Sequence, residues 1–183
     1  MLSLKQLIYL TVFFLLSCKN EKDIESLEVV KAQIIENSFK ITLNILLNET
    51  DDLSLYYTTD NSTNFKIDPI WKNVKGDDKP QDVIFLIEND KPPTLFRIDF
   101  GMNPKQKKIV FNYIVFEFNG KKIKFIGSDL GSIFRADESK CNFDSSSGLL
   151  TPLFNNGERQ TPSLYPHETV MGPEIEKLTH IKN

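Results

Sequence analysis

A period of two in the hydrophobic pattern predicts β-strands through the middle of the chain. Phe39, Ile41, Leu43 and Ile45 alternate with polar residues between positions 39 and 47, which indicates a strand with one buried and one solvated face. Similar β-rich runs cover 27–35, 53–58, 65–74 (interrupted by Pro69), 81–87, 94–100, 108–118 and 121–126. Because these runs recur at short intervals without a helical segment, they predict an antiparallel sandwich or barrel.

Turn signals separate these runs and set the expected extent of the domain. Residues 36–38 predict a hairpin turn between the strands at 27–35 and 39–47, and Asn119-Gly120 is the strongest short hairpin signal in the chain. We expect a mainly β fold, a single jelly-roll-like antiparallel β-sandwich over 27–136. The rest, 137–183, is rich in Ser, Pro, Asn and Gly and predicts an irregular, partly ordered strap with one short helical turn at 174–178.

The first residues have the pattern of a secretory signal. Lys5 precedes an apolar run at 7–16, and small Ser17 follows it. Since about 20 apolar residues are needed to cross a bilayer, this run predicts a cleaved signal peptide over 1–17. The polar residues that follow predict a solvated tether over 18–26.

Leu15-Leu16-Ser17-Cys18 resembles the lipobox of bacterial lipoproteins. The resemblance implies cleavage between Ser17 and Cys18, lipidation of Cys18 and anchoring to a membrane. In enterobacterial lipoproteins an aspartate after the cysteine signals retention in the inner membrane, so Lys19 at that position favours the outer membrane. The charged run at 19–23 is similar to the surface-export signal of Bacteroidota lipoproteins. Both the periplasmic and the cell-surface face of that membrane stay open.

A second resemblance concerns the β-rich region. The segments Leu55-Tyr56-Tyr57, Trp71, 81–85, 95–99 and 109–111 are similar, in order, to a small β-sandwich module that accompanies surface-polysaccharide glycosyltransferases. The chain has Phe100-Gly101 where that module has Pro-Gly. The resemblance implies a jelly-roll-like fold and carries no implication about activity.

Composition excludes several classes of function. The chain holds 25 acidic and 22 basic residues, with a net charge of −3, which argues against nucleic acid as a partner. Two cysteines and two histidines exclude a disulfide scaffold and disfavour a zinc site. If Cys18 is lipidated, Cys141 is a free or intermolecular thiol. Acidic residues at 51–52, 77–78 and 82 could bind calcium but lack EF-hand spacing, so we predict no metal and no cofactor.

The search for catalytic motifs finds no nucleophile elbow, phosphate loop or metalloprotease helix, so no catalytic residue is predicted and an enzymatic role stays open. The candidate ligand-binding residues are aromatic side chains that could stack on a sugar ring, and one arginine. These residues are Trp71, Tyr56, Tyr57, Tyr165 and Arg97. Arg97 shares a strand face with Asp99, so it could bind a sugar hydroxyl or carboxylate, or form a structural pair. A lone tryptophan in a domain of this size is more often a core residue than a ligand platform, so the sequence favours a core position for Trp71.

Together these observations predict a lipid-anchored envelope lipoprotein with a non-catalytic binding domain for a glycan or an envelope protein. Two alternatives stay open. One is a glycan hydrolase that uses two loop carboxylates as acid and base. The other is an accessory subunit of an outer-membrane complex.

Overall fold

The computed structural model describes residues 38–88 and 91–179. The expected signal peptide, the lipidation site at Cys18, the tether and the strand at 27–35 lie outside the described residues. Within the described part, no helix combines the length and the apolar character that crossing a membrane requires.

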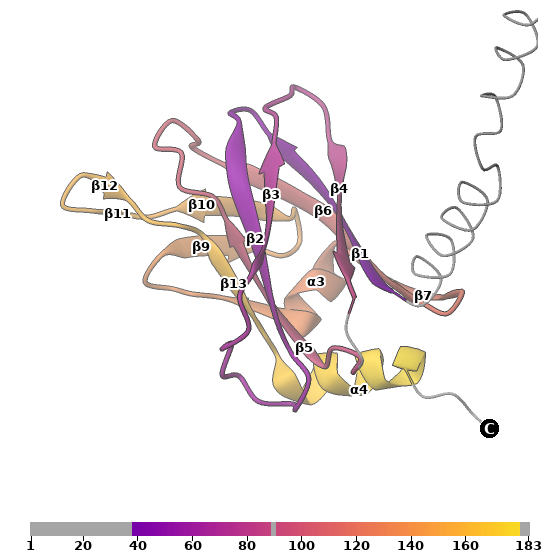
Figure 1. Ribbon diagram of the computed structural model, residues 1–183. Helices are drawn as coiled ribbons and strands as arrows, with labels where there is room; N and C mark the ends of the chain where they lie inside the picture. The colour runs from indigo at the N-terminus through magenta and orange to yellow at the C-terminus, as the bar shows by residue number, and fades with distance from the viewer. Residues whose placement is uncertain (1–37, 89–90, 180–183) are drawn as a thin grey trace, which may run out of the picture. The chain divides into compact units, whose positions relative to one another are not determined.

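The described residues form two antiparallel sheets packed face to face (Figure 1). The six-stranded sheet has the order β4 (Gln81–Ile87), β1 (Phe39–Leu47), β6 (Ile109–Phe118), β10 (Leu149–Pro152) and β9 (Cys141–Asp144), and β7 (Lys121–Ile126) also pairs with β6. The five-stranded sheet has the order β3 (Ile70–Val74), β2 (Asp51–Thr58), β5 (Leu95–Phe100), β13 (Ser163–Pro166) and β8 (Phe134–Ala136). The antiparallel β-sandwich expected from the sequence is confirmed.

Alternation along β1 builds the centre of the core. Its residues at odd positions, from Phe39 to Leu47, are all buried, and those between them are partly exposed, as the sequence predicted. Phe39 meets Phe96 of β5 at 5.6 Å between ring centroids, and Phe96 stacks on Phe116 of β6 at 5.1 Å. Aromatic side chains from the two sheets therefore interdigitate, which couples the sheets into one core.

A β-bulge explains why β6 lacks a clean period of two. Asn44 of β1 is opposite Tyr113, whereas Ile45 is opposite Phe111, so Asn112 is the extra residue. The inward set shifts there from Ile109 and Phe111 to Ile114 and Phe116, all of which are fully buried.

The β6–β7 connection confirms the hairpin predicted at Asn119-Gly120. Lys121 returns opposite Phe118, and the two turn residues have φ of 48° and 74°. Positive φ at both positions is typical of the type I′ turn, whose twist matches that of the strands. By contrast β1, the expected hairpin partner of 27–35, pairs with β4 on one edge and with β6 on the other.

The expectation of an irregular strap after residue 136 was wrong for the described part. β9 and β10 extend the six-stranded sheet, and β13 joins β5 to β8 in the five-stranded sheet, so the domain continues past Ala136. A further hairpin, β11 (Phe154–Asn155) with β12 (Glu158–Arg159), projects from the sheets (Figure 1). These strands are two to four residues long, too short for a period of two to stand out in the sequence.

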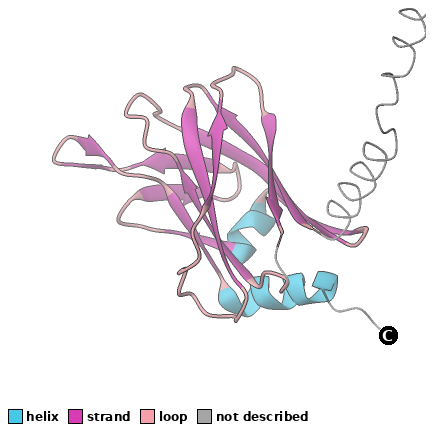
Figure 2. Cartoon of the chain, viewed as in Figure 1, coloured by secondary structure: helices cyan, strands magenta, loops and turns pink. Residues whose placement is uncertain are grey.

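The helices lie at one end of the sandwich (Figure 2), where α3 (Ser128–Ile133) contacts α4 (Glu168–Thr179). The sequence predicted only a short turn at 174–178, but α4 begins earlier and contains Pro173. Proline removes one helical hydrogen bond. Burial of Met171, Ile175 and Leu178 on one side of α4 stabilises the helix in spite of this loss.

Candidate functional site

The outer face of the five-stranded sheet collects most of the candidate binding residues. Trp71 is opposite Ser54, and Ser54 is opposite Asp99, so these three residues form one row across β3, β2 and β5. Tyr56 and Arg97 form the next row. Directly paired residues point to the same side of a sheet. We call the surface formed by Tyr56, Phe65, Trp71, Arg97, Asp99 and Tyr165 the Trp71 face.

Arg97 is the centre of this face. Its Nε donates to Oδ1 of Asp99 at 2.9 Å, and its Nη2 donates to Oδ2 at 2.6 Å. The guanidinium carbon lies 4.6 Å from the Tyr56 ring centroid and 4.8 Å from that of Tyr165. Burial alone would lower the pKa of Arg97, but the hydrogen bonds and charge of Asp99 outweigh it and raise that pKa. The guanidinium is therefore held in one orientation by the carboxylate and the two rings.

Two residues that contact the tyrosine rings of this face, Phe65 and Arg135, were not identified as candidates from the sequence. The Phe65 ring meets both tyrosine rings edge-on, at 6.4 Å from each centroid. Arg135 lies 5.6 Å from the Tyr165 ring and 3.6 Å from Glu168 of α4. Both contacts join segments that are remote in the chain, and no local pattern marks either residue.

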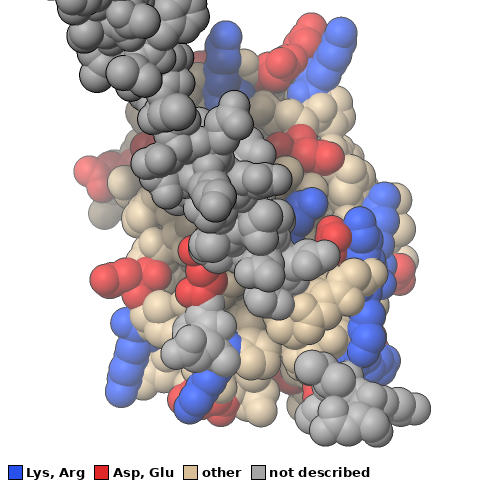
Figure 3. All heavy atoms as spheres, turned by 45° about the vertical axis from the view of Figure 1, so that its right-hand side comes forward, with Lys and Arg blue, Asp and Glu red and all other residues tan. Residues whose placement is uncertain are grey.

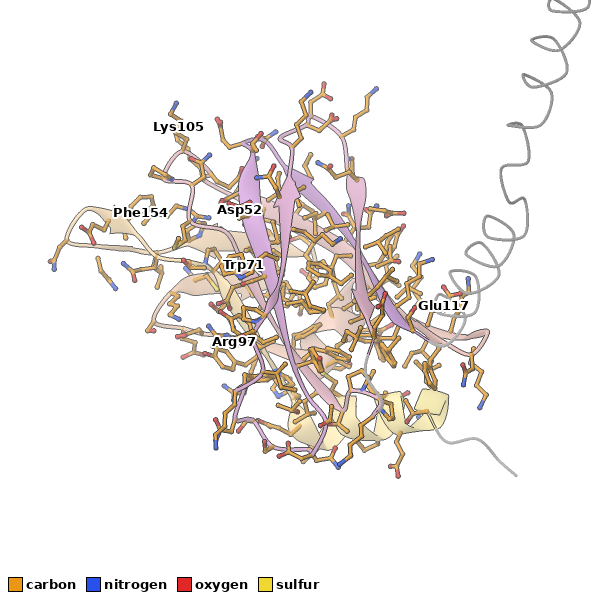
Figure 4. All side chains as sticks on the ribbon, viewed as in Figure 1. Asp52, Trp71, Arg97, Lys105, Glu117 and Phe154 are labelled. Atoms are coloured by element: carbon orange, nitrogen blue, oxygen red, sulfur yellow. The ribbon has the colours of Figure 1, made fainter. Side chains whose placement is uncertain are left out.

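Trp71 is the exposed aromatic of this face. Its side chain is 56% exposed, so it is not a core residue. Figure 4 shows Trp71 and Arg97 on the same sheet, with Phe154 on the projecting hairpin away from them. The row from Trp71 through the small side chain of Ser54 to Asp99 places a flat apolar ring beside a polar pair.

Tyr57 does not belong to the Trp71 face, although the sequence marked it as a ligand candidate. It is 8% exposed and packs in the core. Neighbouring residues on a strand point to opposite faces, so Tyr56 and Tyr57 cannot both bind one ligand. Tyr57 lies at the same alternate positions of the strand as Leu53 and Leu55, both of which are buried. This alternation is the sequence signal that could have predicted an inward side chain for Tyr57.

The loop carboxylates considered for metal binding or catalysis have structural partners. Asp51 accepts backbone N–H groups of Met102 and Asn103. Asp52 accepts from Asn73 at 2.7 Å, and Asp82 accepts from Asn44 at 2.6 Å. Among the described residues no group of three His, Cys, Asp or Glu side chains is placed to hold a metal ion.

The carboxyl groups whose pKa values are shifted also differ from a general acid, because their pKa values are lowered. The pKa values of Asp60, Asp137 and Asp144 are lowered, chiefly by serine hydroxyls that donate to them, and that of Asp77 is lowered by the N–H of Lys79. A carboxylic acid that donates a proton near neutral pH needs a raised pKa. These four groups therefore do not support the hydrolase alternative.

Charges of both signs are mixed on the surface shown in Figure 3, where Lys and Arg side chains lie beside Asp and Glu side chains. Comparison of the chain with protein-family models, curated proteins and solved structures yielded no match.

Proposed function

We propose that this protein is a lipid-anchored lipoprotein of the outer membrane whose domain binds a glycan, without catalysis, through the Trp71 face. The observation that carries the proposal is the exposed Trp71 indole, held on a strand beside the Arg97–Asp99 pair. A sugar ring has one face of C–H groups, which an indole ring can cover, and a rim of hydroxyl groups that need hydrogen-bond partners.

The polar side of the face matches the rim of a sugar. Arg97 uses Nε and Nη2 on Asp99, and its Nη1 makes no hydrogen bond within residues 38–88 and 91–179. Nη1 is therefore available to donate to a sugar hydroxyl. Because the tyrosines and Asp99 fix the guanidinium before binding, little conformational entropy is lost when the sugar docks.

The chain contains one tryptophan, so its fluorescence reports directly on Trp71. The purified full-length chain in detergent is titrated with hexasaccharides of glucose, xylose and N-acetylglucosamine while the emission spectrum is recorded. We expect a saturable shift in emission with at least one of them. Absence of any shift, together with absence of heat in calorimetry, would contradict glycan binding at Trp71.

A matched pair of variants distinguishes binding at the Trp71 face from nonspecific binding to any exposed aromatic side chain. Trp71→Ala is expected to lower affinity at least about tenfold, because it removes the stacking surface. Phe154→Ala removes an aromatic side chain of similar exposure, 57%, on the projecting hairpin, and is expected to bind as the wild type does. Equal loss in both variants, measured by calorimetry, would contradict a role for the Trp71 face.

The anchor is tested separately at Cys18. Cells that express the wild type or Cys18→Ala are fed radiolabelled fatty acid, and intact cells are then treated with external protease. We expect label in the wild type only. Protease sensitivity places the domain on the cell surface, and resistance places it in the periplasm. Absence of label in the wild type would contradict the lipoprotein assignment.

A further inference from the structure

A second surface lies at the end of the sandwich away from the helices, where the loop 101–108 meets the β11–β12 hairpin. It exposes two apolar side chains, Met102 at 72% and Phe154 at 57%. It also exposes Lys105, Lys107 and Lys108. We call these five residues the Met102–Phe154 tip. Figure 4 shows Lys105 and Phe154 at this end of the molecule.

Asp51 fixes one side of the 101–108 loop, which carries Met102 and the three lysines of the tip. The Asp51 carboxylate accepts N–H bonds from Met102 at 2.9 Å and from Asn103 at 3.0 Å. Gly101 turns the chain with φ of 66°, and a Cβ at this position would overlap the Asp51 carboxylate. Asn103 also donates through Nδ2 to the carbonyl of Thr50 at 2.8 Å.

The interior of the loop is filled by Gln106, whose side chain is buried. Its Oε1 accepts the N–H of Glu49 at 2.7 Å, and its Nε2 donates to the carbonyl of Lys108. Both polar ends of Gln106 therefore have partners, one within the loop and one at Glu49. The lysines before and after it are held outward on a fixed backbone.

Arg159 ties the hairpin to this loop. Its Nε donates to the carbonyl of Gln106 and its Nη1 to that of Gly101, both at 2.8 Å. Arg159 is directly opposite Phe154 in the β11–β12 pair. Paired residues share a face, so Phe154 lies on the side of the hairpin that contacts the loop. Arg159 therefore joins the hairpin that carries Phe154 to the loop that carries Met102 and the three lysines.

The three lysines carry the net charge of the tip. The buried Asp51 carboxylate and Arg159 have opposite charges that attract each other, so together they add little net charge. Glu158 neighbours Arg159 on β12, so it points to the opposite side of the hairpin. The Nη2 of Arg159 is buried without a partner among the described residues.

We propose that the Met102–Phe154 tip binds the surface of an anionic phospholipid bilayer. The three lysines pair with lipid phosphates, and Met102 and Phe154 enter the boundary between headgroups and acyl chains. Basic side chains next to apolar ones are the combination that such a surface attracts. About 20 residues separate Cys18 from the start of β1, and a chain of that length can reach ~70 Å, so an anchor at Cys18 would not prevent the contact.

Depth-dependent fluorescence quenching tests the contact without relying on the anchor. The full-length chain carrying Trp71→Phe and Phe154→Trp has its single tryptophan in the tip. It is reconstituted into phosphatidylglycerol or phosphatidylcholine vesicles that contain brominated acyl chains. We expect a blue-shifted emission and at least twofold stronger quenching in the phosphatidylglycerol vesicles, reduced by 0.5 M salt.

Three controls make the result specific. Lys105→Gln, Lys107→Gln and Lys108→Gln together should abolish the difference between the two lipids. A second triple variant carries Lys121→Gln, Lys122→Gln and Lys124→Gln in β7 and so removes the same charge elsewhere. It should keep the difference between the two lipids. The wild type, whose only tryptophan is Trp71, should show no quenching. Quenching that is equal in both lipids, absent from position 154, or equally lost in both triple variants would overturn the proposal.

Discussion

Arg97 and Asp99, two positions apart on β5, form a two-point ion pair on the outer face of the five-stranded sheet, with donor–acceptor distances of 2.9 and 2.6 Å. The side chains are 20% and 12% exposed, so water screens the pair only weakly. The pair fixes the orientation of the guanidinium and makes the stability of the sheet dependent on it, because each side chain has little water to replace its partner.

Arg97→Ala should therefore destabilise the fold. It leaves the Asp99 carboxylate poorly solvated and removes the group between Tyr56 and Tyr165, at an expected cost of about 2–4 kcal/mol in the free energy of unfolding. Arg135→Ala removes an arginine that also contacts Tyr165 but pairs with Glu168 in solvent, and should cost less than ~1 kcal/mol. Urea denaturation of both variants measures the difference, and equal costs would show that the Arg97 pair is no stronger than a surface pair.

Gly101→Ala should be more damaging than an alanine at another glycine of positive φ. At Gly101 the new Cβ would overlap the Asp51 carboxylate, and at Gly120 it would meet no atom within 4 Å. We expect about 1–2 kcal/mol for Gly120→Ala from backbone strain alone, and about 2–4 kcal/mol for Gly101→Ala from strain plus steric overlap. Thermal denaturation of the two variants checks this order. A Gly101→Ala protein as stable as Gly120→Ala would mean that Asp51 does not hold the 101–108 loop.

Cys141 should be unreactive in the folded protein. Its thiol is fully buried and lies 3.8 Å from the carbonyl oxygen of Ser163. Burial raises the pKa of Cys141 above its ordinary value of 9.0. We expect reaction with a disulfide reagent at pH 8 to be on the order of 100-fold slower than in denaturant. A native rate equal to the denatured rate would contradict the burial.

The same shift predicts a change in stability with alkaline pH. The contribution of the Cys141 thiol to stability is complete below pH 9.0, where it is protonated in both states, and is lost as pH rises towards the higher folded pKa. Cys141→Ala should therefore show a shallower decline in unfolding free energy above pH 9 than the wild type does. Parallel declines would contradict the raised pKa.

Acid should weaken the fold through serine-bound carboxylates. Ser139 donates to Asp137, and Ser146 donates to Asp144, each through Oγ at 2.6 Å, which lowers both pKa values from 3.8. Their contribution is present above pH 3.8 and is lost as pH falls through the lower folded values. The double variant Asp137→Asn and Asp144→Asn should lose less stability between pH 4 and 2 than the wild type does, measured by urea denaturation. Asp68→Asn, in an exposed loop, should behave as the wild type.

The sequence by itself determined the strands in which buried and exposed residues alternate along the chain. β1 and β4 have the bounds that the alternation predicted, and Asn119-Gly120 makes the expected hairpin. These features depend on neighbours along the chain, since parity decides which side of a strand is wet and two residues with positive φ decide a tight turn. The same parity placed Arg97 and Asp99 on one face.

Tertiary structure decided what the local pattern does not contain. Tyr165 joins Arg97, Arg159 joins the 101–108 loop, and the short strands after residue 136 complete both sheets. Each of these depends on segments separated by tens of residues, and two- to four-residue strands are stabilised by the sheets that they join rather than by their own sequence. The Trp71 face and the Met102–Phe154 tip arise in this way. Strand pairing within the five-stranded sheet assembles the first, and the hydrogen bonds of Arg159 join the hairpin to the loop in the second.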